Sequence, residues 1–325
     1  MVDWQKFEGS AFEYDKHVIR LGGGIYQSYA WGEMKRDGDQ IPLRMVAYEG
    51  TEIVAAVSVM VRRRYGVAVA WIPGGPAGNL GLFDREFRKA LVSMTGGVFH
   101  YCRLAIEAPS TDEDKKILAH GGWIKPLKPL ASGLTMHYSL LDDEAYRLDR
   151  ATANWRHNYR RSARHGLTVE QWIKPDVASM EIIYREMEAL KSLPIQQTKQ
   201  TLERMVGTLG DKLIVYRCLD PDGKLTCFRA AALFGNRAWD MLAGATGLAR
   251  KTYASYATLW ALTNHCQKLG AAIYDLSGVD PVHNKGVFDF KSGIGSEIVE
   301  CLGEWEWASH PLLARLANWF IARNA

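Results

Sequence analysis

The stretch GAAIYDLSGVDPVHNKGVFDFKSGIGSEIVECLGEW, from Gly270 to Trp305, decides the fold. It begins with the short apolar run Ala271-Ala272-Ile273-Tyr274 and ends with Glu297-Ile298-Val299-Glu300, in which polar and apolar residues alternate. Both patterns are typical of strands. Between them, Phe290-Lys291 precedes the glycine-rich turn Ser292-Gly293-Ile294-Gly295, where backbone can approach a ligand closely. We therefore predict two strands around a binding edge that exposes one lysine.

The elements that precede this stretch occur in a similar order twice. The first half predicts a helix at 26–35, strands at 43–48, 53–59 and 67–72, a glycine-rich loop at 73–81, a helix at 84–94 and a strand at 102–107. The second half predicts a basic helix at 151–165, a strand at 168–172, helices at 177–191 and 201–209, strands at 212–218, 225–233 and 238–243, a loop at 244–247, a helix at 254–269 and the strand at Ile273. Each order is that of a GNAT-like α/β unit. We therefore predict an α/β fold with two such units in tandem.

Several pieces of the sequence together resemble the Fem family, whose members take an amino acid from aminoacyl-tRNA and join it to an amine of a peptidoglycan precursor. The pieces are Gln27-Ser28-x-x-Trp31-x-x-x-Lys35, NWRHNYRR at 154–161, ASYATLW at 254–260, DLSGVDP at 275–281, GVFDFKSGIG at 286–295 and EIVECLGEW at 297–305. The resemblance implies the same twin GNAT fold, with the C-terminal helix packing back on the first domain. We expect a first domain at 1–148, completed by 308–325, and a second at 149–307. The long charged arm of some members is absent from the second domain.

Length and composition are those of an ordinary soluble protein of two domains. Of the 325 residues, 47% are apolar and 23% are charged, and the net charge of +4 is only mildly basic. A nucleic-acid partner must therefore be argued from local clustering of charge, and we expect tRNA rather than DNA. The five cysteines form no CxxC pair, which favours reduced core thiols of a cytosolic protein over disulfides or a zinc site.

The two ends of the chain bear on its location. The N-terminus lacks the pattern of a signal peptide, and no apolar run approaches the roughly 20 residues that span a bilayer. We expect a cytoplasmic protein, and a monomer. The apolar stripe Leu312, Leu313, Leu316, Ala317, Phe320 and Ile321 indicates a packed amphipathic helix, with peripheral contact to a membrane surface as the alternative.

A cluster of arginines lies on the basic helix of the second half. Arg156, Arg160 and Arg164 recur every four residues, and Arg161 follows one position on, so a helix gathers them on about half its surface. Like charges at this spacing repel one another, and tRNA phosphates would relieve that cost. The alternative is a solvated face whose arginines pair with acidic residues.

The resemblance implies roles for residues of the first half. Lys35, four residues after Trp31, has the pattern of the lysine with which relatives bind phosphates of a nucleotide-linked acceptor. Glu107 stands where relatives carry an acid, often Asp, that orients the attacking amine. The alternatives are a surface lysine and a structural carboxylate at a strand end.

In the second half we expect Lys291 and Tyr256 at the catalytic site, and Phe290 and Arg229 in contact with substrate. Attack of an amine on an ester passes through an oxyanion, and a fixed cation lowers that barrier without transferring a proton. The alternative for Tyr256 is aromatic packing.

Three other constellations carry less chemistry. Asp275, Asp280 and His283 lack the further ligands of a metal site, and capping of the loop explains the aspartates. The loop at 73–81 has no Gly-Lys-Ser/Thr ending, so it is no ATP site. The segment Gly244-Ala-Thr-Gly-Leu-Ala-Arg250 does not match the turn with which ordinary GNAT enzymes hold coenzyme A pyrophosphate.

We therefore expect an aminoacyltransferase that needs no metal and no cofactor. Its donor would be aminoacyl-tRNA, and its acceptor a nucleotide- or lipid-linked peptide of peptidoglycan synthesis. Two alternatives stay open: an N-acyltransferase that uses acyl-CoA or an acyl carrier, and a binding protein for tRNA or a cell-wall precursor without catalytic activity.

Overall fold

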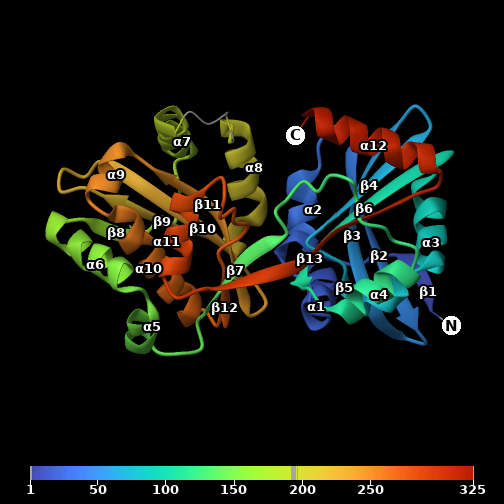
Figure 1. Ribbon diagram of the computed structural model, residues 1–325, viewed down its shortest axis with the longest axis horizontal. Coiled ribbons are helices and arrows are strands. Elements are labelled where there is room, and N and C mark those ends of the chain that lie inside the picture. The colour runs from blue at the N-terminus through green and yellow to red at the C-terminus, as the bar shows by residue number, and fades with distance from the viewer. Residues whose placement is uncertain (1, 192–194, 196, 325) are drawn as a thin grey trace. The chain divides into compact units, whose positions relative to one another are not determined.

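Two compact units, each with its own strands and helices, organise the chain (Figure 1). The computed structural model describes residues 2–191, 195 and 197–324. Contacts divide the chain into unit 1, Met1–Leu134 with Glu300–Ala325, and unit 2, Thr135–Val299. This arrangement confirms the predicted α/β fold of two GNAT-like units with the C-terminal segment returned to the first.

Unit 1 has a mixed sheet in the order β1-β2-β3-β4-β6-β13. Its strands are β1 (Asp3–Lys6), β2 (Gln40–Glu49), β3 (Glu52–Arg64), β4 (Val67–Pro73), β6 (Phe99–Pro109) and β13 (Glu297–Ala308), with β5 (Ala77–Gly78) paired to β3. The strands predicted at 43–48 and 53–59 are β2 and β3, which pair antiparallel, and only β4 and β6 run parallel among these pairs. The order of helix, three strands, helix and strand is therefore present as predicted.

Helices cover both faces of this sheet because the strand residues alternate between them. On one face, Val57 and Val59 pack with Phe87 of α3 (Arg85–Thr95) and Leu118 of α4 (Asp112–His120). On the other lie α1 (Ala11–Arg20), the short helix η1 (Ile25–Gln27) and α2 (Tyr29–Lys35), after which Figure 1 shows the chain entering β2. The short helix η2 (Leu80–Leu82) precedes α3.

Buried charges fix the C-terminal segment in unit 1. Arg103 of β6 and Glu304 of β13 form an ion pair at 2.6 Å, with side chains 2% and 4% exposed. Glu306 accepts hydrogen bonds from Tyr101 at 2.7 Å and from the Asn318 amide at 2.8 Å. Asn318 belongs to α12 (Pro311–Asn324), so this helix is tied to the sheet through one buried carboxylate.

Unit 2 has a sheet in the order β7-β12-β11-β10-β9-β8. Its strands are β7 (Leu134–Ser139), β8 (Thr168–Gln171), β9 (Leu213–Leu219), β10 (Leu225–Phe234), β11 (Arg237–Ala245) and β12 (Ile273–Asp275). The helices are α5 (Glu144–Arg150), α6 (Ala153–Ser162), η3 (Ala163–His165), α7 (Val177–Lys191), α8 (Lys199–Leu209), η4 (Gly210–Lys212), α9 (Gly247–Lys251), α10 (Ala254–Lys268) and α11 (Lys285–Gly293).

Neighbouring residues of β10 face opposite sides of this sheet. Phe228 packs against Tyr184 of α7, with ring centroids 5.4 Å apart. The Cys227 sulfur lies 3.2 Å from the Thr258 hydroxyl of α10. Arg229 lies two residues after Cys227 and therefore faces the same side of the sheet. The site residues of unit 2 accordingly lie on the face covered by α10.

Two segments lie in different units from those expected by sequence. Residues 135–148, expected in the first domain, cluster with unit 2 because β7 pairs with β12. Residues 300–307, expected in the second, cluster with unit 1 because β13 pairs with β6. No helix in the described part of the chain is long and apolar enough to cross a bilayer.

Arg103→Met should lower the free energy of unfolding by about 3–5 kcal/mol, because it leaves the Glu304 carboxylate buried without its counter-charge. Urea unfolding followed by circular dichroism measures this. Arg62→Met is the control, since its pair with Asp39 is half exposed and should contribute less than about 1 kcal/mol. Equal effects of the two substitutions would contradict the role given to the buried pair.

Candidate functional site

Lys291 lies within α11 and is buried, with 8% of its surface exposed. Its Nζ donates to the Gly278 carbonyl at 3.1 Å and lies 3.5 Å from that of Ser277. Burial lowers the pKa of Lys291 below its ordinary value of 10.5. The prediction of an exposed lysine beside a turn is wrong, because the helix continues through Gly293 and the amine bonds to the loop after β12.

Ser277 shapes the carbonyls that hold this amine. Its backbone has a φ of 61°, in the left-handed region that residues with side chains seldom adopt. Its N–H donates to the Asp275 carboxylate at 2.8 Å, and its hydroxyl donates to the Asp240 carbonyl at 2.7 Å. These bonds hold a conformation that costs on the order of 1–3 kcal/mol, as strained backbone at functional sites does.

Asp275 is a buried carboxylate with several partners. It accepts hydrogen bonds from the Thr135 hydroxyl at 2.5 Å and the Arg237 guanidinium at 2.6 Å. Burial alone would raise the pKa of Asp275, but the hydrogen bond with His137 and the charge of Arg237 more than offset it, so the pKa is lowered. An ionised Asp275 therefore anchors the loop, as its predicted capping role requires.

Arg229 and Asp240 form a two-pronged ion pair on neighbouring strands. The guanidinium donates through Nε at 2.8 Å and Nη2 at 2.6 Å, and both side chains are less than 9% exposed. Tyr274 donates to the same carboxylate at 3.1 Å. Burial alone would lower the pKa of Arg229, but Asp240 more than offsets it and the pKa is raised. Arg229 is thus permanently charged, and the Asp240 carboxylate supplies its counter-charge.

Aromatic rings connect this buried pair to α6. The Arg229 guanidinium lies 5.5 Å from the Phe290 ring, which meets Tyr256 edge to face at 5.0 Å. Tyr256 in turn packs against Trp155 at 5.4 Å, and its hydroxyl accepts a hydrogen bond from Asn158 at 3.1 Å. The structure therefore places Arg229, Phe290 and Tyr256 in one chain of contacts, with Lys291 next to Phe290 on α11.

The arginine cluster lies on α6 and η3, with Arg160 and Arg164 exposed and Arg156 half-buried. Arg156 donates to the carbonyl of Ala151 at 2.5 Å, near the start of its own helix. Arg161 lies over the ring of Tyr253 at 4.4 Å. Within residues 2–191, 195 and 197–324, no carboxylate lies at ion-pair distance from these four arginines.

The predicted residues of the first half lie in unit 1. Lys35 ends α2 with its Nζ 5.0 Å from the Trp31 ring, and Trp31 is buried against Tyr26. Glu107 lies near the end of β6 and is half-buried. Lys35 and Trp31 are thus neighbours, whereas Glu107 stands on a different element.

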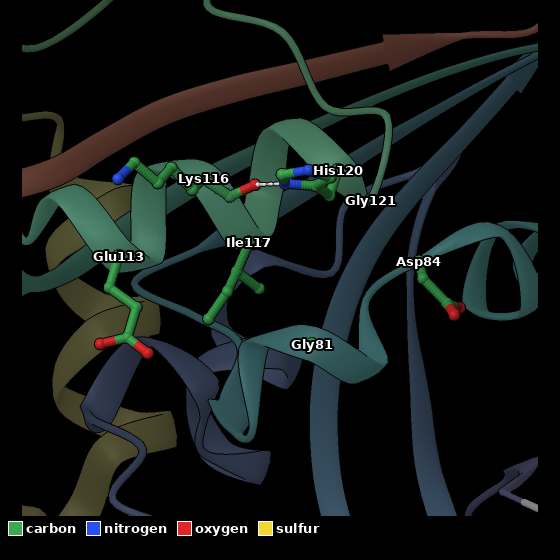
Figure 2. A pocket seen from close by; sticks show the side chains of 7 residues that line it. All are labelled: Gly81, Asp84, Glu113, Lys116, Ile117, His120 and Gly121. Atoms are coloured by element: carbon green, nitrogen blue, oxygen red, sulfur yellow. Dashed lines mark hydrogen bonds between the residues drawn. The ribbon is translucent and has the colours of Figure 1, made fainter.

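A pocket of about 370 Å³ lies elsewhere in unit 1, between η2 and α4 (Figure 2). It is lined by Gly81, Asp84, Glu113, Lys116, Ile117, His120 and Gly121. Asp84 caps α3, and the ring of His120 bonds to the Lys116 carbonyl, as Figure 2 shows. None of the predicted site residues lines this pocket.

Asp275, Asp280 and His283 do not form one metal site, because Asp275 bonds to different partners from the other two. Asp280 accepts hydrogen bonds from the backbone and ring of His283, at 2.8 Å each, while Asp275 is bonded to Arg237. In the part of the chain that the structure describes, no group of three or more His, Cys, Asp or Glu side chains is placed to hold a metal.

The sequence analysis did not identify four residues that hydrogen-bond to the predicted site residues or to their partners. These are Asp240, Ser277, Tyr274 and Asn158. Asp240 had a signal, because it is an acid within an otherwise apolar strand and Arg229 is a base within another. Buried charges of this kind require a partner. The left-handed backbone of Ser277 had no signal, since a serine in a loop predicts no particular φ.

The arrangement defines a class of fold, that of tandem GNAT-like proteins. A crystal structure of FemX has a TM-score of 0.84 at 13% sequence identity, covering 97% of this chain and 100% of that chain. L-PGS from Bacillus licheniformis has a TM-score of 0.57 at 15% identity, with 96% of each chain covered. A tandem GNAT protein from the clavulanic acid biosynthesis pathway has 0.56 at 14%, covering 96% of this chain and 99% of that one.

Residues 230–321 match the model of the FemAB family. This segment contains β11, α10, α11, β13 and most of α12, and hence Asp240, Tyr256 and Lys291. The resemblance to the Fem family is thereby confirmed. No curated protein matches the sequence.

Lys291 should titrate below 10.5 because burial disfavours its charged form, and Asp240→Asn should lower its pKa further because the Asp240 carboxylate raises it. NMR of lysine labelled at Cε, with Lys291→Met for assignment, measures both values. Asp280→Asn, which changes an exposed carboxylate paired with His283, should leave the titration unchanged. A pKa at or above 10.5 in the unmodified protein would contradict the environment described here.

Proposed function

We propose that this protein is an aminoacyltransferase that moves an amino acid from aminoacyl-tRNA to an amine of a peptidoglycan precursor peptide. The observation that carries the proposal is a chain of ring contacts in unit 2. Phe290, the residue next to the buried Lys291, packs against Tyr256, which packs against Trp155 of α6, the helix that carries Arg156, Arg160 and Arg161. The FemAB match over residues 230–321 supports the same function.

The reaction would proceed by attack of the acceptor amine on the ester carbonyl. A C–N bond forms, the C–O bond to the tRNA ribose breaks, and the proton lost by the amine ends on the ribose hydroxyl. The donor is already activated, so positioning and charge stabilisation supply the catalysis. We assign the developing oxyanion to Lys291, and the orientation of the amine to Glu107.

Lys291 retains capacity for this role. An ammonium has three N–H donors, and the described contacts direct the amine to two carbonyls, those of Ser277 and Gly278. Burial lowers the pKa of Lys291 and the Arg229 charge lowers it further, while Asp240 and Asp275 oppose both effects and favour the charged form. Tyr256 and Phe290 would bound the space beside it.

The remaining predicted residues receive substrate-binding roles in the same proposal. The arginines of α6 and η3 would bind tRNA phosphates, and Lys35 beside Trp31 would bind phosphates of the acceptor. Arg229 would also act through Phe290, because Nε and Nη2 of its guanidinium already donate to Asp240. Direct contact of Arg229 with substrate stays a prediction.

A coenzyme A donor receives less support. The turn after β11 is where ordinary GNAT enzymes hold the pyrophosphate, and here the Gly247 N–H donates to the Glu186 carboxylate at 2.9 Å. A carboxylate at that position repels a pyrophosphate and occupies one of the donors that it would need.

Replacing Arg156, Arg160 and Arg164 with Gln should weaken tRNA binding and reduce its salt dependence. The reason is that each phosphate contact releases counterions when it forms, so fewer are released when contacts are lost. We expect the slope of log K against log salt to fall by about one for each lost contact. Filter binding across a salt series measures this. Arg185→Gln is a control on α7, where the arginine already pairs with Glu181. An unchanged slope in a folded triple variant would contradict the assignment.

Lys291→Met should lower kcat by about 10²–10³, the scale of losing one oxyanion donor, with little change in donor KM. The activity of wild type should also fall as pH rises through the lowered pKa of Lys291, because the neutral amine carries no charge. Transfer from charged tRNA to precursor peptide, followed by mass spectrometry, measures both.

The two parameters separate the possible roles of Lys291. A higher donor KM with unchanged kcat would mean that the lysine grips the tRNA instead. A variant that is folded and fully active would overturn the catalytic role, and binding of tRNA without transfer by wild type would favour a binding protein.

A further inference from the structure

The outward face of α12 is apolar. Leu312, Leu316 and Trp319 are 58%, 61% and 55% exposed, and their spacing of four and three residues places them on one side of the helix. The opposite side is fixed by Asn318, which is buried and donates to Glu306. Of the stripe predicted to pack, Leu312 and Leu316 are therefore exposed to solvent, whereas Leu313 and Ala317 are half-buried. The side chains of Phe320 and Ile321 lie outside the described residues.

A second apolar segment adjoins this helix. In the loop before β7, Leu127 and Leu130 are 83% and 51% exposed. The backbone N–H of Lys128, between them, donates to the Asn318 side chain at 3.4 Å. The two segments are thus held together, and we call Leu127, Leu130, Leu312, Leu316 and Trp319 the apolar surface of unit 1.

The charged side chains of these two segments are all basic. Arg315, Arg323 and Lys128 are exposed, and the Arg323 guanidinium lies 4.9 Å from the Trp319 ring. Neither segment 121–134 nor segment 310–325 contains an Asp or Glu. Exposed apolar side chains gathered on one helix face mark an interaction site, and the basic side chains beside them favour an anionic partner.

We propose that unit 1 docks through this surface on an anionic lipid membrane. A helix that lies in the headgroup region buries leucines and a tryptophan among acyl chains and places arginines against lipid phosphates. A second copy of the chain fits less well, because self-association through this surface would bring its own arginines together without counter-charges.

Docking would deepen the proposed function, on which this step rests. An enzyme held at the membrane surface by unit 1, the unit that contains Lys35, is suited to a lipid-linked peptide rather than a freely diffusing nucleotide-linked one. Membrane binding itself requires no transfer activity, so the two proposals can fail separately.

Co-sedimentation of the full chain with vesicles tests the docking. Binding should be strong with phosphatidylcholine mixed with phosphatidylglycerol, weaker with phosphatidylcholine alone, and reduced by salt. Leu316→Ser with Trp319→Ser should lower the partition coefficient at least about tenfold, because two apolar side chains no longer leave water. Arg315→Gln with Arg323→Gln should remove most of the preference for the anionic vesicles.

A matched control uses Ile182→Ser with Leu190→Ser on α7, where the two side chains are 66% and 53% exposed. This variant should sediment like wild type. Equal loss in the control, or no binding by wild type, would overturn the proposal. So would a dimer in gel filtration that only the Leu316 and Trp319 substitutions dissociate, since the surface would then belong to a second copy. Vesicle binding without transfer would retain the docking and reject the proposed reaction.

Discussion

The buried pair of Arg229 and Asp240 is the interaction on which the arrangement of unit 2 depends. Burying two charges costs several kcal/mol for each, and the cost is offset only where geometry is good and the remaining oxygens are satisfied. Here both prongs of the guanidinium are used, and Tyr274 donates to the same carboxylate. The pair fixes the guanidinium beside Phe290, and the Asp240 backbone accepts from Ser277. The positions of α11 and of the loop after β12 follow from these contacts.

Periodicity in the sequence predicted β8 to β12 of this sheet, though not β7, and it could not predict how Arg229 and Asp240 pair. Arg229 stands opposite Ala243, but the register shifts between Ala230 and Ala231, so that Ala231 stands opposite Asp240. This bulge inserts one residue into β11 and turns Asp240 to the same face as Arg229. In a regular ladder the two side chains would lie on opposite faces. A single inserted residue leaves no mark in the alternation of apolar and polar residues. The two lone charges therefore signal that each needs a partner, but not that a bulge brings them to one face.

The glycines after Lys291 show why the local structure there was mispredicted. Glycine in a short run favours a turn, and the sequence analysis placed one at 292–295. A Cβ at Gly293 would lie 3.0 Å from the Trp155 ring, so the residue is small because α11 packs closely on α6. The same glycine is compatible with a helix at a cost of about 1 kcal/mol.

In unit 1, by contrast, the capping box Ser10 to Glu13 was present in the sequence as a signal for the overlooked α1.

The environment of Lys291 has to meet two opposing demands under the proposed function. A cation stabilises an oxyanion more strongly where water is excluded, but exclusion of water also lowers its pKa and favours the neutral amine. The Asp240 and Asp275 carboxylates oppose that loss, whereas the nearby Arg229 charge adds to it. Each carboxylate also forms an ion pair with an arginine, Arg229 or Arg237. Neither carboxylate bonds to the amine, which instead donates to neutral backbone carbonyls. A direct ion pair would neutralise the charge that the reaction needs, whereas carbonyls orient the ammonium and leave its charge available. The strained Ser277 provides one of these carbonyls, which gives a physical reason for its left-handed backbone.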